Sequence, residues 1–256
     1  MIDWLAFTAR RPLYNTYSGY WLYTHVLLNR GDKRFGKVRR LRTGAHRFLL
    51  TGYPRSGNTY LTSMVQKVLE VDDFGHHLHT RLGLKLAVRE GIRAYVVFRS
   101  PLESVMSLIL LNSNRNGKFV RFHWLDSAHL LQNSLLLLYI REYIHYHEYA
   151  LSRPDRINLI PSKVAFSQTQ DVLARIACEN DLDASRVTKE RCSWAENAFL
   201  ERKHRKQKDT LTAGAPNAEK EAAKAKLREK VESHPLMHRA NETFERMEER
   251  STIPEK

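Results

Sequence analysis

The segment from residue 52 to residue 59 combines two glycines, an arginine and three hydroxyl side chains. It reads Gly-Tyr-Pro-Arg-Ser-Gly-Asn-Thr and follows a short apolar run. A glycine-containing turn between a strand and a helix can point several backbone N–H groups at one anion. The nucleotide-binding pattern GxxxxGK[ST] shares both glycines and the final threonine, but Asn58 stands in place of its lysine. The segment therefore predicts a phosphate-binding loop whose positive charge comes from Arg55.

A second pair of candidates follows a run rich in β-branched and aromatic residues, Ile-Arg-Ala-Tyr-Val-Val-Phe at residues 92–98. Arg99 comes directly after this run, and Ser107 lies eight residues further on. An arginine can pair with a phosphate through two parallel hydrogen bonds. An arginine at a strand end or a serine in a helix is also common without any function. Arg99 and Ser107 therefore indicate a phosphate site only in combination with the loop at residues 52–59.

Three histidines lie within four residues between these two segments: His76, His77 and His79. Imidazole titrates near neutral pH, so any of the three could remove a proton from a hydroxyl group. A metal site is the weaker interpretation, because no carboxylate partner stands at a fixed spacing. The cluster therefore indicates a general base.

Strand, loop and helix alternate along the chain. Apolar runs predict strands at 48–51, 92–98 and 157–160. Helical spacing of apolar residues predicts helices at 59–71, 102–111, 124–151 and 168–180. This order predicts an α/β fold: a P-loop-like, three-layer αβα domain with a central, mainly parallel sheet.

The two motifs together resemble those of sulfotransferases that use 3′-phosphoadenosine 5′-phosphosulfate (PAPS). Residues 51–60 resemble the family's 5′-phosphosulfate loop, and residues 95–107 resemble its 3′-phosphate motif. The resemblance covers about residues 46–112. It implies a single sulfotransferase domain over residues 1–256 that moves a sulfuryl group from PAPS to an acceptor hydroxyl, without a metal.

The resemblance also implies roles for individual residues. His79 matches the family's base by position, with His77 as its rival, and Arg55 would neutralise charge on the leaving oxygen. Arg99 and Ser107 would hold the 3′-phosphate. The implied PAPS-binding residues are Arg55, Ser56, Gly57, Asn58, Thr59, Tyr60, Arg99 and Ser107. The family's C-terminal segment RKGxxGxxK has no clear match here; only a basic run at 202–208 stands near its place.

Charge and composition indicate an anionic partner. The chain carries 42 Lys and Arg against 28 Asp and Glu, a formal net charge of +14. A basic surface suits an anionic polysaccharide, and the basic, aromatic segment 1–45 suits a glycolipid acceptor or peripheral membrane contact. Nucleic acid is not expected, because no nucleic-acid motif is present. With two cysteines and no convincing signal peptide, the expected location is cytoplasmic, with membrane-peripheral as the alternative.

The C-terminal half changes composition twice. Residues 202–217 are basic and then rich in Thr, Ala, Gly and Pro, which predicts a mobile loop. Residues 218–247 are charged and alanine-rich, which predicts one helical stretch, and residues 248–256 are expected to fray.

Two other functions stay open from the residues alone. A nucleotide or small-molecule kinase with a degenerate P-loop would explain the glycines, although Asn58 and the missing acidic Mg²⁺ site disfavour it. A non-enzymatic basic module that binds anions would explain the charge.

Overall fold

A four-stranded parallel sheet forms the centre of the molecule. The structure is a computed structural model that describes residues 45–76, 79–115, 128–206 and 218–251. Strands β1 (Phe48–Gly52), β2 (Gly75–His76), β3 (Arg93–Phe98) and β4 (Ile157–Pro161) lie in the order β2-β1-β3-β4. All three strand pairings are parallel. The three predicted strands and the parallel sheet are therefore confirmed.

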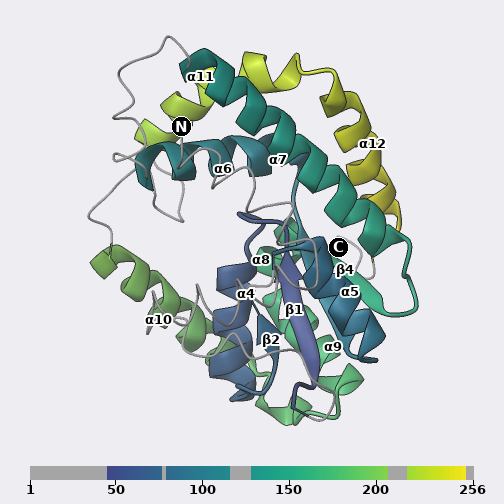
Figure 1. Cartoon of the computed structure of the whole chain (residues 1–256). Coiled ribbons are helices and arrows are strands. Elements are labelled where there is room, and N and C mark those ends of the chain that lie inside the picture. Colours follow the sequence, from purple (N-terminus) through teal and green to yellow (C-terminus); the bar gives the residue numbers. More distant parts are fainter. Residues whose placement is uncertain (1–44, 77–78, 116–127, 207–217, 252–256) are drawn as a thin grey trace.

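Helices connect and cover these strands (Figure 1). Their bounds in the described residues are α4 (Asn58–Met64), the π-helix η3 (Val65–Leu69), α5 (Arg81–Arg89), α6 (Pro101–Arg115), α7 (Ala128–Leu151), α8 (Ser162–Ser167), α9 (Thr169–Glu179), the short 3-10 turn η4 (Ala184–Arg186), α10 (Lys189–Lys206), α11 (Ala218–Glu232) and α12 (Leu236–Glu249). The four predicted helices all appear, with the first continuing from α4 into η3.

Alternate residues of β1, β3 and β4 point into two separate hydrophobic cores. In β1, Leu49 faces one core, while Phe48 and Leu50 face the other. Helices α5, α6, α7, α11 and α12 supply the first core. Helices α4, α8, α9 and α10, together with η3, supply the second. Because side chains alternate across a strand, the sheet is buried on both faces, and the three-layer αβα prediction is confirmed.

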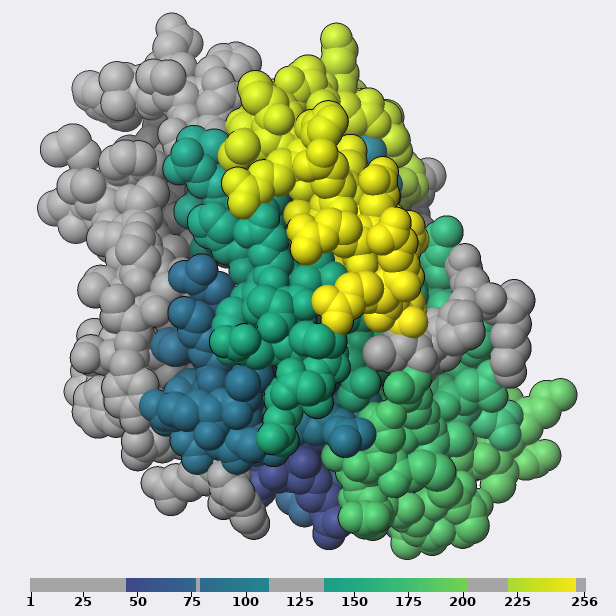
Figure 2. Space-filling model, turned by 90° about the vertical axis from the view of Figure 1, so that its right-hand side faces the viewer, coloured from purple at the N-terminus to yellow at the C-terminus, as the bar shows by residue number. Residues whose placement is uncertain are grey.

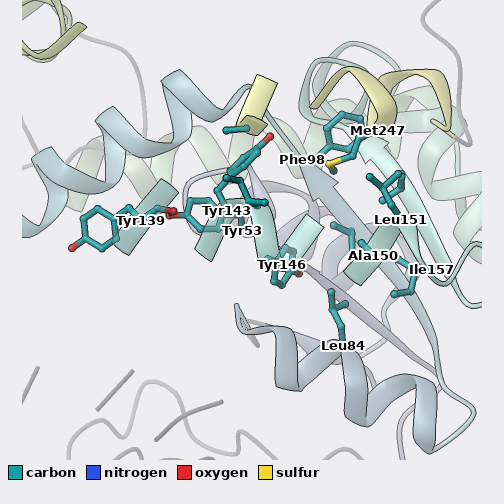
Figure 3. Close-up of a cluster of buried hydrophobic side chains, with 14 of the residues drawn as sticks. Tyr53, Leu84, Phe98, Tyr139, Tyr143, Tyr146, Ala150, Leu151, Ile157 and Met247 are labelled. Atoms are coloured by element: carbon teal, nitrogen blue, oxygen red, sulfur yellow. The ribbon is translucent and has the colours of Figure 1, made fainter. Parts of the chain in front are cut away.

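Aromatic side chains fill the first core behind the glycine-containing loop. The Tyr53 hydroxyl donates to the Tyr139 carbonyl at 3.0 Å, and its ring meets Tyr143 edge to face at 5.3 Å. Figure 3 shows Tyr53, Tyr139, Tyr143 and Tyr146 gathered along α7. The loop thus begins on a residue that is fixed in the core at both its ring and its hydroxyl.

The C-terminal helices pack on this same side of the sheet. Figure 2 shows α12, in yellow, lying along α7, in teal. The single helical stretch predicted for 218–247 is wrong: it is interrupted at residues 233–235 between α11 and α12. Pro235 explains the break, because proline disfavours helical geometry in the residue before it and lacks an N–H donor.

The basic segment after residue 201 also differs from its prediction. Helix α10 continues to Lys206, so residues 202–206 are helical rather than a loop, as expected for lysine and arginine, which are good helix formers. The remainder of that predicted loop, 207–217, and the N-terminal segment 1–44 lie outside the described residues. Among the helices that the structure describes, none has both the length and the hydropathy of a membrane span.

Candidate anion-binding site

The loop between β1 and α4 leaves the sheet through a glycine that has no room for a side chain. A Cβ atom at Gly52 would lie 2.1 Å from the Val97 carbonyl oxygen and 2.6 Å from Asn58 Oδ1. Because β1 and β3 are hydrogen-bonded neighbours, neither backbone can retreat easily. The sequence therefore needs glycine here to bring the loop against the end of β3.

Two residues of the loop adopt left-handed backbone conformations. Arg55 has φ 75°, and Gly57, directly before α4, has φ 96°. Such a conformation is ordinary for glycine and uncommon for arginine. The Ser56 N–H donates to the Tyr53 carbonyl at 3.2 Å and closes the turn. An observed backbone outlier next to a helix start is a frequent feature of ligand-binding loops.

Polar side-chain atoms in the loop are buried without partners. Ser56 Oγ and Asn58 Oδ1 are both inaccessible and make no hydrogen bond to any described residue. Thr59, in the first turn of α4, is exposed. A buried polar group without a partner is costly, so it calls for a missing water, ion or ligand. The Ser56 hydroxyl can donate to an oxygen-rich anion such as a phosphate, whereas Asn58 Oδ1 only accepts and needs a donor such as water.

The residue at the P-loop lysine position faces away from such an anion. Asn58 is 4% exposed, and its side-chain amide donates to the Tyr53 carbonyl at 3.3 Å. The Asn58 side chain therefore stabilises the loop through the loop's own backbone and does not point toward solvent.

Tyr60 also faces inward. Its ring packs at 4.5 Å from Phe166, its hydroxyl meets Thr169 at 2.8 Å, and its N–H donates to the Gly57 carbonyl. Tyr60 therefore lies in the second core, and its side chain is not brought to the mouth of the loop with the other predicted residues.

The two sequence motifs meet in space. Arg55 Nε donates to Ser107 Oγ at 3.0 Å, although the residues are 52 positions apart. Ser107 is 3% exposed, so in this conformation Arg55 covers its hydroxyl. The guanidinium of the loop and the helix that follows β3 thus form one continuous site.

This meeting point has a topological cause. β1 continues into α4 on one face of the sheet, whereas β3 continues into α6 on the other face. Adjacent parallel strands whose connections leave on opposite faces open a crevice at their carboxyl ends. Both motifs begin at the carboxyl ends of these two strands, Arg55 after β1 and Arg99 after β3.

Arg99 is held at its backbone and at its side chain. Its carbonyl accepts a hydrogen bond from the Tyr143 hydroxyl at 2.8 Å. Its guanidinium donates to Glu103 Oε2 at 3.0 Å, and 38% of its side chain is exposed. Arg99 is therefore preorganised and still accessible to an anion.

Glu103 stays ionised despite its partial burial. Burial raises the pKa of its carboxyl group, but the hydrogen bond and charge of Lys224, with the charges of Arg99 and Arg228, lower the pKa more, so that it lies below its usual value. Glu103, Lys224 and Tyr143 were not among the residues that the sequence predicted. The spacing Ser100-x-x-Glu103 is a capping-box signal that could have identified Glu103, since Ser100 Oγ accepts from its N–H at 3.4 Å.

His79 lies at the entrance of the loop. Its Nδ1 is 2.8 Å from the Gly52 carbonyl oxygen, and the neighbouring Thr80 begins α5 by accepting a hydrogen bond from the Gly83 N–H. A carbonyl only accepts, so Nδ1 carries the hydrogen and Nε2 of the neutral ring is the atom that can take a proton. His76 ends β2 next to β1, and His77 lies outside the described residues.

Comparisons with known proteins add no assignment. No protein-family model matches the chain, and neither the curated proteins nor the solved structures contain a match. Over the described ranges, no three His, Cys, Asp or Glu side chains are grouped so that they could hold a metal ion. The metal-free chemistry implied by the resemblance stays a prediction.

Proposed function

We propose that this chain is a sulfotransferase that moves a sulfuryl group from PAPS to an acceptor hydroxyl. The observation that carries the proposal is the 3.0 Å contact between Arg55 and Ser107, which joins the two predicted motifs at the carboxyl ends of β1 and β3. A nucleotide with phosphates at both its 5′ and 3′ positions needs two cationic grips at once. Arg55 and Arg99, from neighbouring strands, supply the two charges.

The loop would hold the 5′ end of the donor. Backbone N–H groups of Gly57, Asn58 and Thr59, with the unpartnered hydroxyl of Ser56, would bind phosphate and sulfate oxygens, whereas the Ser56 N–H is already bonded to the Tyr53 carbonyl. Arg55 would balance charge that develops on the leaving oxygen; an arginine can do this without giving up its proton. PAPS, when bound, supplies the sulfuryl group.

Arg99 and Ser107 would hold the 3′-phosphate. The exposed part of Arg99 offers the bidentate geometry that phosphate prefers. Ser107 can reach an anion only if Arg55 shifts its hydrogen bond, because Arg55 now covers the serine hydroxyl. The grip on the 3′-phosphate is what would separate PAPS from ATP.

His79 would act as the general base. With Nδ1 fixed on the Gly52 carbonyl, the ring is oriented at the start of the same loop. Its Nε2 would take the acceptor's proton as the sulfuryl group is transferred. We propose a carbohydrate or a glycolipid as the acceptor, on the basis of the net charge of +14, and a cytoplasmic or membrane-peripheral location.

The experiment follows the release of adenosine 3′,5′-bisphosphate (3′,5′-ADP) from PAPS in the presence of anionic polysaccharides, neutral sugars and glycolipids. At least one class should accelerate release and become sulfated. His79→Gln should lower transfer by about 100-fold or more, the usual contribution of a general base. His76→Gln is the matched control. ATP-dependent phosphorylation in place of sulfation would contradict the proposal and support a kinase.

A further inference from the structure

Glu103 joins the end of β3 to a helix far along the chain. Its Oε2 accepts from Arg99 at 3.0 Å and from Lys224 Nζ at 2.6 Å, and Arg228 lies 3.6 Å from its Oε1. Lys224 is 121 positions away, on α11. One carboxylate oxygen thus bridges Arg99, at the end of β3, and Lys224 on α11.

Burial makes this bridge a specific contact. Lys224 has only 6% of its side chain exposed, and Glu103 only 24%. A lysine is seldom so buried unless its ammonium group is paired, because removing a charge from water is costly. The ion pair therefore fixes α11 against the first turn of α6 at one defined point.

The partners differ in how much they depend on Glu103. Lys224 also pairs with Glu221 at 3.1 Å, and Arg228 pairs with Glu232 at 3.1 Å, both within α11. Among the described residues, Arg99 pairs with no carboxylate besides Glu103. Loss of the Glu103 charge would leave the α11 cations paired and would release Arg99.

We infer that Glu103 is a positioning residue that orients Arg99 for the 3′-phosphate and couples that grip to the docking of α11 through Lys224. The inference rests on the proposed function. A guanidinium held in place loses less freedom when it binds an anion, so its affinity is higher. Coupling between two sites is reciprocal, so an anion on Arg99 would also stabilise the position of α11.

The first test compares the affinities of 3′,5′-ADP and 5′-AMP by calorimetry. Glu103→Gln should lower the affinity for 3′,5′-ADP about tenfold, the equivalent of one charge-assisted hydrogen bond, and the affinity for 5′-AMP less than twofold. Lys224→Met should also lower the affinity for 3′,5′-ADP. The matched control Glu221→Gln, which removes the other carboxylate of Lys224, should change either affinity less than twofold.

The double variant Glu103→Gln/Lys224→Met leaves no unpaired buried charge and covers the case that a single variant fails to fold. It should bind 3′,5′-ADP no more weakly than Glu103→Gln alone, since the two residues act through one contact. If Glu103→Gln or the double variant binds 3′,5′-ADP as tightly as the wild-type protein or more tightly, the inference is overturned. Glu103 would then compete with the anion for Arg99. If the wild-type protein does not bind 3′,5′-ADP, the proposed function fails first and the inference falls with it.

Amide hydrogen exchange tests the coupling to α11. Addition of 3′,5′-ADP to the wild-type protein should slow exchange across residues 218–232, whereas 5′-AMP should not. The slowing should disappear in Glu103→Gln. Unchanged exchange in α11 when the wild-type protein is saturated with 3′,5′-ADP would contradict the coupling.

Discussion

The two ends of the sheet differ in whether their buried polar groups have hydrogen-bond partners. At the amino ends of β3 and β4, the Glu179 carboxylate accepts from Tyr95 at 2.7 Å, Arg175 at 2.7 Å, Arg93 at 3.0 Å and Asn158 at 3.2 Å. At the carboxyl ends of β1 and β3, Ser56 Oγ and Asn58 Oδ1 are buried without partners, and Arg55 has a left-handed backbone.

The difference separates a structural network from a site. The Glu179 network satisfies its members internally, and although burial raises the pKa of Glu179, its hydrogen bonds lower that pKa below the usual value. The loop end keeps unsatisfied groups, which a folded protein tolerates where a ligand completes them. Changes at the Glu179 end should therefore alter stability, and most changes at the loop end should alter anion binding.

The largest expected effect comes from Gly52→Ala. The added Cβ would meet the Val97 carbonyl at 2.1 Å, so β1 and β3 would have to separate. We expect a loss of about 3 kcal/mol or more in the free energy of unfolding, measured in urea.

Gly91→Ala is the control for this substitution. Gly91 has φ 70° but open space around its Cβ position, so alanine should cost only about 1 kcal/mol, from the backbone conformation alone. Equal losses in the two variants would show that crowding at the loop is not the constraint.

Glu179→Gln tests the structural end. The amide keeps the shape of the carboxylate but loses its charge, leaving Arg93 and Arg175 less well paired. We expect a loss of about 2 kcal/mol in the free energy of unfolding and less than a twofold change in 3′,5′-ADP affinity. A large loss of affinity in this variant would break the distinction between the two ends.

His147 gives a smaller effect that depends on pH. It is fully buried behind the loop, and its imidazole ring lies next to the rings of Tyr53 and Tyr143. Its Nε2 has no hydrogen-bond partner among the described residues. Burial lowers its pKa from 6.5 to about 3, although the hydrogen bond with the Tyr143 carbonyl opposes this shift. Between these two values the unfolded chain binds one more proton, so stability should fall as the pH drops below about 6.5.

The predicted slope for His147 is about 1.4 kcal/mol per pH unit within that window. His147→Leu should remove this contribution when unfolding is measured from pH 7 to pH 5. His238→Leu, on the exposed side of α12, is the control. Identical pH profiles for the wild type and His147→Leu would contradict the assignment.

Sequence patterns predicted the frame of the molecule because its central strands are buried on both faces. Phe48–Leu50 and Ala94–Phe98 are continuous buried apolar runs, and the glycines and Arg55 mark the loop between strand and helix. β2 was missed because it has only two residues, and its pairing depends on Leu49 and Leu50 of β1. The strand exists through its partner rather than through its own pattern.

The candidate site was predictable only where its parts are local. Arg55, Arg99 and Ser107 stand at recognisable offsets, but nothing in the sequence brings Lys224 to Glu103 across 121 positions. The inward turn of Tyr60 also depends on packing, since its ring is fixed by Phe166 and Phe199 from distant helices. Long-range packing decides such contacts, and local spacing does not encode it.

The binding of 3′,5′-ADP through Arg99 is tested most directly by a calorimetric titration of wild-type protein and Arg99→Ala with 3′,5′-ADP, 5′-AMP and ATP. We expect the wild type to prefer 3′,5′-ADP and Arg99→Ala to lose about 100-fold in affinity for 3′,5′-ADP, while the affinity for 5′-AMP changes little. Equal binding of ATP and 3′,5′-ADP by the wild type, or an unchanged preference in Arg99→Ala, would contradict the assignment of Arg99 to the 3′-phosphate.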